Sequence, residues 1–247
     1  MASTVVVTSW SPEGYRTYGK RFIETFLRCW PESIPLHVWH EAEPPEESDA
    51  RLHAFDLSLD EDLQVFVREH SSPKTLSKDP LWGAIKWCKK VFAISQPRYA
   101  SAEAAASATW MIWIDGDVEH TGPVTTEFLH AVCADDADLA FLGRPWYRYS
   151  ECGFVAYRIE ALRVRELLIH MRKTYASGDV FQLPEWGDSF VFDRCRKALG
   201  GLRENDLARH LCPPDRAIHI WPATILGTVM RHNKGPGRKT QAYGATT

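Results

Sequence analysis

The chain lacks the features that mark several large classes of protein. None of its six cysteines forms a C-x-x-C pair, so no zinc site is indicated and the thiols are expected to be reduced. No run of about 18 apolar residues is present, and residues 1–7 lack the basic start of a signal peptide. No internal repeat is evident. These absences predict a cytoplasmic protein that does not insert into a membrane.

The charge balance excludes a further class. A formal net charge of -3 does not fit a uniformly basic nucleic-acid binder, although a local basic patch stays compatible with it. The 247 residues, of which 45% are hydrophobic, suffice to bury a substantial core. This length suits one elaborated domain better than two.

Hydrophobic periodicity predicts an α/β protein. The β-branched run at 4–8 indicates a buried strand, the spacing at 15–26 a helix, and the alternation at 34–40 a second strand. This strand–helix–strand order is typical of the start of an α/β sheet. The pattern of residues 51–70 is ambiguous. We expect further strands at 110–114, 138–144, 152–158 and 218–221, and further helices at 81–92, 126–133, 164–175 and from 188 or 189 to 198.

The strongest predicted strand, WMIWI at 110–114, ends in Asp115-Gly116-Asp117. Carboxylates at this place project into the crevice beyond the sheet edge, where α/β folds bind ligands. Gly116 permits a tight turn and a close approach of ligand to backbone. Two hard oxygen ligands suit Mn²⁺ or Mg²⁺, and such a metal can hold a diphosphate. The alternative is a plain surface turn, because Asp and Gly are common turn residues.

A second motif, HNKGPGRK, occupies residues 232–239. His232 can serve as a third metal ligand. The glycines, Gly235 among them, allow backbone to approach a phosphate, and Arg238 and Lys239 supply positive charge for it. The alternative is a basic disordered tail.

Together, the two motifs resemble those of the GT-A fold glycosyltransferases, in particular the glycogenin-like and bacterial lipooligosaccharide galactosyltransferase group. The resemblance implies that Asp115, Asp117 and His232 hold Mn²⁺, and that the metal holds the diphosphate of a nucleotide-sugar donor. It also implies that Gly235 and Arg238 touch that diphosphate. The chain departs from the family in carrying Arg238 where Lys is usual and in being short.

The same resemblance places the nucleotide base, expected to be that of a UDP-sugar, at the end of the first strand. The residues concerned are Thr8, Ser9 and Trp10, with Tyr15 close by in the sequence. The resemblance implies a single Rossmann-like domain of the GT-A type, with a mixed central sheet flanked by helices. Residues 1–117 would form its nucleotide-sugar-binding half and residues 118–230 its acceptor-binding half. A basic tail at 231–247 would close the donor site.

Three lysines, Lys86, Lys89 and Lys90, lie off the apolar face of the helix predicted at 81–92. Because this helix shortly precedes the strand at 110–114, Lys86 is a candidate to approach the diphosphate. The alternative is an ordinary solvated face.

Two segments that follow the donor motif, YSECGF at 149–154 and EWGDS at 185–189, each place a carboxylate beside a glycine and an aromatic residue. Sugar transfer needs a group that accepts the proton of the acceptor hydroxyl or stabilises an oxocarbenium-like centre. Asp188 is the first candidate, since inverting GT-A enzymes carry a carboxylate in a similar place. Glu151 and Glu185 come next. A plain helix N-cap is the alternative for Asp188.

The predicted activity is transfer of a sugar from a nucleotide-diphosphate donor to an acceptor hydroxyl. The TSWSPEGY, YSECGF and EW-x-DS segments are similar to those of small transferases encoded by phages and environmental genomes. One expected acceptor is therefore the hydroxymethyl group of a modified pyrimidine in DNA, and a saccharide, lipid-linked or protein acceptor is the alternative. Two other classes stay open: a phosphohydrolase of the haloacid dehalogenase type, and a non-catalytic nucleotide or nucleic-acid binder.

Overall fold

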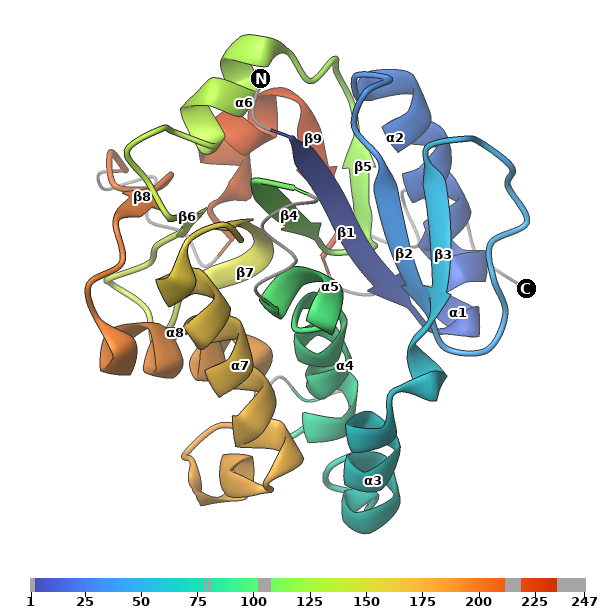
Figure 1. The fold of residues 1–247 in the computed structure, drawn as a ribbon, viewed down its shortest axis with the longest axis vertical. Coiled ribbons are helices and arrows are strands. Elements are labelled where there is room, and N and C mark those ends of the chain that lie inside the picture. The colour runs from blue at the N-terminus through green and yellow to red at the C-terminus, as the bar shows by residue number, and fades with distance from the viewer. Residues whose placement is uncertain (1–2, 78, 80, 102–107, 212–218, 235–247) are drawn as a thin grey trace.

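A seven-stranded mixed sheet forms the centre of the molecule. The computed structural model describes residues 3–77, 79, 81–101, 108–211 and 219–234, and the spatial order of its strands is β3-β2-β1-β4-β7-β6-β8 (Figure 1). In chain order these strands are β1 (Thr4–Trp10), β2 (Leu36–His40), β3 (Leu52–Asp56), β4 (Trp110–Ile114), β6 (Leu139–Leu142), β7 (Glu151–Arg158) and β8 (Glu204–Asp206). A separate ribbon pairs β5 (Val118–His120) with β9 (Met230–His232). The predicted α/β architecture is confirmed.

Helices cover both faces of this sheet (Figure 1). They are α1 (Pro12–Gly14), α2 (Lys20–Cys29), α3 (Glu61–His70), α4 (Ala84–Ile94), α5 (Pro97–Ala100), α6 (Thr126–Val132), α7 (Leu162–Ala176) and α8 (Asp188–Leu199). Side chains alternate along β4, so Met111 and Trp113 enter the core shared with α3, α4, α7 and α8. The intervening Ile112 enters the opposite core, shared with α2 and α6.

Strand direction determines which loops meet. β1 runs parallel to β2 and to β4, as crossover helices require. β7 runs antiparallel to β4, with Ile114 opposite Phe154. The residues that leave β4 therefore lie beside the residues that enter β7. Because Val118 of β5 pairs with His232 of β9, the end of the described chain reaches the same place.

Some sequence predictions about elements are wrong. Residues 219–220 are irregular and a 3₁₀ turn, Trp221–Ala223, follows them; the last strand is β9 instead, and Ile218 lies outside the described residues. The N-cap of α8 is Gly187, so Asp188 is the first residue of that helix and not its cap. The three-residue strands β5 and β8 were not predicted, because so short a segment carries too little periodicity.

Two of the expected absences can be compared with the structure. Among the described residues, no helix is long and apolar enough to cross a membrane. The five cysteines in this part of the chain are free, and three of them, including Cys88 and Cys152, are buried. Cys212 lies outside the described residues.

Candidate functional site

The Asp115-Gly116-Asp117 turn is held by backbone hydrogen bonds on both sides. The Asp115 N–H donates to the carbonyl of Gly153 in β7 over 2.8 Å, and the Val118 N–H closes the turn on the Asp115 carbonyl over 3.1 Å. The Asn233 N–H donates to the Asp117 carbonyl over 3.1 Å. Both aspartates are thus placed by β7 and by the segment after β9, unlike those of a freely solvated turn.

His232 approaches both aspartates from β9. Its Nε2 atom lies 3.1 Å from Asp117 Oδ1 and 3.8 Å from Asp115 Oδ2, and its side chain is 1% exposed. One ligand atom from each of the three residues lies within 4.8 Å of the other two. The structure therefore brings together the three residues that the sequence proposed as metal ligands, although more than a hundred positions separate His232 from the aspartates.

The electrostatics of this cluster favour a positive charge. Burial lowers the pKa of His232, but the neighbouring Asp117 and Glu151 carboxylates raise it to about 9. A buried imidazole is expected to be neutral, so the carboxylates outweigh burial here. Two carboxylates and one imidazole are also a donor set that divalent cations accept. The residues present thus fit a divalent metal, which would take the place of the proton on His232.

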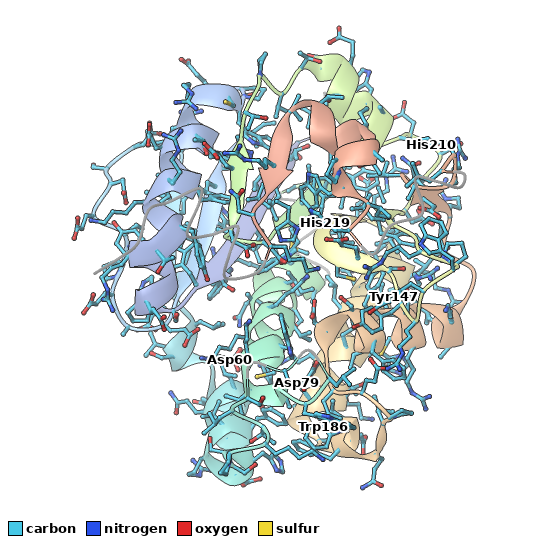
Figure 2. The ribbon with its side chains drawn as sticks, turned by 180° about the vertical axis from the view of Figure 1, so that it is seen from behind. Asp60, Asp79, Tyr147, Trp186, His210 and His219 are labelled. Carbon is cyan, nitrogen blue, oxygen red and sulfur yellow. The ribbon has the colours of Figure 1, made fainter. Side chains whose placement is uncertain are left out.

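Glu151 lies behind His232, at the start of β7. Its side chain is 0% exposed, and its Oε1 lies 3.4 Å from His232 Nδ1, 3.2 Å from His219 Nδ1 and 3.3 Å from Lys234 Nζ. Figure 2 shows His219 beside β7. Burial raises the pKa of Glu151, but His219, His232 and Lys234 hold it well below its usual range. Glu151, His219 and His232 form a second group whose ligand atoms lie within 4.8 Å of one another.

Lys90 links the aspartate turn to α8. Its Nζ lies 3.5 Å from Asp115 Oδ1 and 2.9 Å from Asp188 Oδ2, and it also donates to the carbonyl of Cys152. Burial lowers the pKa of Lys90, but Asp188 and Asp115 raise it above its usual range.

The expectation that Lys90 belongs to a face directed away from the core is wrong, because this side chain is buried. The sequence carried a signal for this burial, because the apolar segment VFAI follows the lysine directly. In the structure all of residues 90–94 are buried. A helix that is apolar all round is buried, so a lysine within it must reach a polar partner. The structure adds this residue to the candidate site.

The remaining candidates on this side differ in their surroundings. Asp188, 7% exposed, is brought to the turn by Lys90. Glu185 forms its ion pair with Arg148 over 2.8 Å. Lys86 is exposed, with its ammonium 4.3 Å from the centre of the Trp87 ring. Trp186 is buried and packs edge-on against Trp82 at 5.0 Å between ring centres.

The end of β1 lies against the same turn. A Cβ atom on Gly116 would lie 3.1 Å from Tyr18, 3.2 Å from Trp10 and 3.3 Å from the Ser9 carbonyl, so only glycine fits without displacement. Burial, with the charges of Asp117 and Asp115, raises the pKa of Tyr18 well above its usual range. In the described part of the chain, Thr8 Oγ1 and Trp10 Nε1 are buried and find no hydrogen-bond partner.

Tyr15 is anchored away from the metal ligands. Its hydroxyl donates to Glu47 Oε2 and accepts from the Glu46 N–H, each over 2.8 Å, while its ring stacks on Trp10 at 6.0 Å. The three other predicted diphosphate contacts, Gly235, Arg238 and Lys239, lie outside the described residues.

Comparison with known proteins identifies a similar fold but no related sequence. No family model matches the chain, and no curated protein matches it. A solved glycosyltransferase involved in the glycosylation of the major capsid of PBCV-1 is similar, with a TM-score of 0.52 and 13% identity over 97% of this chain and 99% of that one. Mouse xyloside xylosyltransferase 1 in its apo form gives a TM-score of 0.49 and 12% identity over 99% of this chain and 94% of that one. By the first of these, the chain has the fold of a glycosyltransferase.

Proposed function

We propose that this protein is a metal-dependent glycosyltransferase that moves a sugar from a nucleotide-diphosphate donor, expected to be a UDP-sugar, to an acceptor hydroxyl. One observation carries the proposal: Asp115, Asp117 and His232 converge at the sheet edge of a glycosyltransferase fold. The same fold counts against the phosphohydrolase alternative, which rested on the Asp-x-Asp motif alone.

The donor set supports Mn²⁺ over Mg²⁺. Imidazole is a poor ligand for Mg²⁺, which prefers oxygen ligands and retains water, whereas first-row metals accept mixed nitrogen and oxygen sets. When bound between Asp115, Asp117 and His232, the ion would neutralise the charge that develops on the leaving diphosphate. Thr8 and Trp10 of β1 carry unpaired buried polar atoms, and Trp10 lies beside Gly116. These atoms support a nucleotide at the end of β1, since buried polar atoms seldom lack partners.

Asp188 is the proposed catalytic carboxylate. It begins α8, where the helix dipole favours negative charge, and the Lys90 ammonium orients its Oδ2 atom over 2.9 Å. A carboxylate fixed beside the donor site can accept the acceptor's proton or stabilise an oxocarbenium-like centre. Glu151 is the weaker candidate, because its side chain is fully buried and its Oε1 already faces His219, His232 and Lys234. Glu185 is engaged by Arg148.

The acceptor is proposed to be anionic, with hydroxymethylated DNA as the specific candidate and a saccharide, lipid-linked or protein acceptor as the alternative. A surface cavity lies along α8, the helix that begins with Asp188, and three of its lining residues are basic: Arg148, Arg194 and Lys197. Asp193 is the acidic residue of that lining. A basic cavity of this kind suits the phosphates of a nucleic acid.

The donor half of the proposal is tested with a panel of nucleotide sugars. We expect one of them, with Mn²⁺, to raise the unfolding temperature, because a ligand at about 100 times its Kd adds about 2.7 kcal/mol of stability. The same sugar nucleotide, radiolabelled, should be turned over by the wild type and not by Asp117→Ala. No turnover of any donor by the wild type would refute the proposal.

The acceptor half is tested with DNA that contains hydroxymethylcytosine or hydroxymethyluracil. Transfer of labelled sugar to either DNA, and none to unmodified DNA, is the expected result. The double variant Arg194→Ala/Lys197→Ala should weaken transfer to DNA while leaving hydrolysis of the donor unchanged, because both side chains are exposed and lie on the cavity. Donor hydrolysis without transfer to DNA would direct the search to saccharide, lipid-linked or protein acceptors.

A further inference from the structure

The second face of His232 suggests a role for the buried Glu151. The imidazole has two nitrogen atoms that look in opposite directions: Nε2 faces Asp117 and Asp115, and Nδ1 faces Glu151 Oε1 at 3.4 Å. No closer acceptor for Nδ1 is found among the described residues, where this atom makes no hydrogen bond. We propose that Glu151 is a positioning residue, which holds the proton of His232 on Nδ1 and so presents Nε2 to the metal. This inference rests on the proposed function.

The chemistry of histidine ligands supports this assignment. A neutral imidazole carries one proton, and the nitrogen that lacks it is the one that binds metal. A carboxylate that faces the other ring nitrogen fixes the tautomer, orients the ring and makes the ligating nitrogen more basic. Glu151 is placed as such a carboxylate must be, since its side chain is 0% exposed and its Oε1 faces the Nδ1 atom of His232.

The surroundings of Glu151 also place the segment that carries His232. Three side chains from residues 219–234 converge on Oε1 of this one carboxylate: His219, His232 and Lys234. Arg144 approaches the other oxygen, Oε2, at 3.7 Å. Glu151 thus attaches the end of the described chain to β7, next to the backbone bond between Asp115 and Gly153.

The Glu151, His219 and His232 group is itself a candidate for a second metal ion, and two facts argue against that reading. His232 would have to bind one ion through each nitrogen, which requires the loss of both ring protons. In addition, Lys234 and Arg144 already supply positive charge to Glu151, which leaves little attraction for another cation. The positioning role of Glu151 requires neither the loss of both ring protons of His232 nor the binding of a second cation.

The test is a titration of Mn²⁺ into wild-type protein and into Glu151→Gln, followed by the electron paramagnetic resonance signal of free Mn²⁺. We expect one ion per wild-type chain and an affinity about 10- to 100-fold lower in the variant, as outer carboxylates of metal-bound histidines typically contribute. The matched control is Glu119→Gln, which removes a buried carboxylate from the neighbouring strand β5, where it pairs with Arg231 of β9. The control should lower stability and leave Mn²⁺ affinity unchanged.

Several outcomes would overturn the inference. Equal Mn²⁺ affinity in the wild type and in Glu151→Gln would remove the positioning role, and two ions in the wild type with one in the variant would establish a second metal site instead. A wild type that binds no Mn²⁺ would contradict the proposed metal-dependent function itself, so the two failures are distinguishable.

A second measurement needs no variant to fold. The ¹⁵N spectrum of wild-type protein loaded with diamagnetic Zn²⁺ reports the tautomer of His232. A proton on Nδ1 with Nε2 bound to metal is expected, and the opposite tautomer would contradict the proposal.

Discussion

Two acidic clusters adjoin the β5–β9 ribbon, and they differ in how their charge is balanced. In the first, Glu119 accepts from Arg21 at 2.9 Å and from Arg231 at 2.5 Å. Burial raises the pKa of Glu119, but the two arginines lower it below the usual value. In the second, Asp115 and Asp117 face His232 one position further along the ribbon.

The difference lies in the partner residues. An arginine is always charged, so it neutralises a carboxylate permanently and holds its oxygens with fixed donors, which leaves little attraction for a metal. A histidine can give up its proton and become a ligand itself. Because side chains alternate along a strand, neighbouring positions of one ribbon can differ in this way. Glu119 and Arg231 form a closed ion pair, which is complete without a metal. Asp115, Asp117 and His232 form an open cluster, which a metal can still join. The first cluster therefore suits a stabilising role, and the second has the free ligand atoms that the proposed metal site needs.

The sharpest test of this contrast compares Asp117→Asn with Glu119→Gln, two charge-removing changes that flank Val118. We expect Asp117→Asn to lower sugar transfer by about 10³-fold, since metal assistance is worth several kcal/mol. Glu119→Gln should lower the free energy of unfolding by about 2 kcal/mol, the contribution of a hydrogen bond to a charged group, with transfer nearly intact. The measurements are the rate of sugar transfer and the free energy of unfolding in denaturant, each on both variants. An equal loss of sugar transfer in Glu119→Gln and Asp117→Asn would contradict the different roles given to the two clusters.

The next largest effect concerns Lys90, the cation that links the open cluster to α8. Lys90→Met leaves Asp188 and Asp115 without their buried ammonium, and we expect a loss of about 3 kcal/mol in unfolding free energy together with reduced transfer. The neighbouring Lys89 is the control, because its pair with Glu41 is partly exposed, and Lys89→Met should cost less than about 1 kcal/mol. Equal losses in the two variants would show that Lys90 acts as an ordinary surface lysine.

A smaller effect is expected at Gly153, which closes the open cluster from β7. A Cβ atom there would lie 2.6 Å from His232 Cε1 and 3.3 Å from Asp115 Oδ2, so Gly153→Ala must displace a ligand. We expect Mn²⁺ affinity to fall by about tenfold, as for a disturbed ligand orientation. Gly122→Ala is the matched control, since its Cβ would meet its nearest neighbour at 3.6 Å. Unchanged Mn²⁺ affinity in Gly153→Ala, measured by calorimetry, would mean that His232 is no ligand.

The smallest predicted effect concerns Trp113, whose Nε1 donates to Asp115 Oδ1 over 2.8 Å. Trp113→Phe removes a hydrogen bond to a charged group worth about 1.5 kcal/mol, and Mn²⁺ affinity should fall by a few-fold. Trp30→Phe provides the control, because this indole donates to His120 Nδ1 over 3.0 Å. Both variants should lose stability, as followed by thermal unfolding. Only the Trp113 variant should bind Mn²⁺ more weakly; the reverse pattern would contradict the role given to Asp115.

The sequence was sufficient for the features that depend on local pattern. Five consecutive apolar residues identified β4, and the structure has that strand with the same bounds, all five residues buried. The two aspartates follow it directly, so their place at the sheet edge could be predicted. The alternation at 34–40 likewise corresponds to β2, Leu36–His40.

Local pattern was insufficient where burial depends on distant partners. Helical spacing placed Lys90 on a face directed away from the core, although the VFAI segment that follows it favoured burial; which partners Lys90 reaches is decided by the packing of α7 and α8 against α4. A strand was expected at 218–221, yet those residues lie where the chain returns to form β9.

Sequence alone determined the composition of the proposed donor site: an apolar strand, two carboxylates at its end, and a late histidine available to join them. Only the tertiary structure decided which charges surround that histidine. The reason is physical: the pKa of His232 and the burial of Glu151 away from solvent depend on groups that lie within a few ångströms and come from β7, from β9 and from the turn after β4. Their separation along the chain carries no information about that distance; the antiparallel pairing of β7 with β4 and of β9 with β5 sets it.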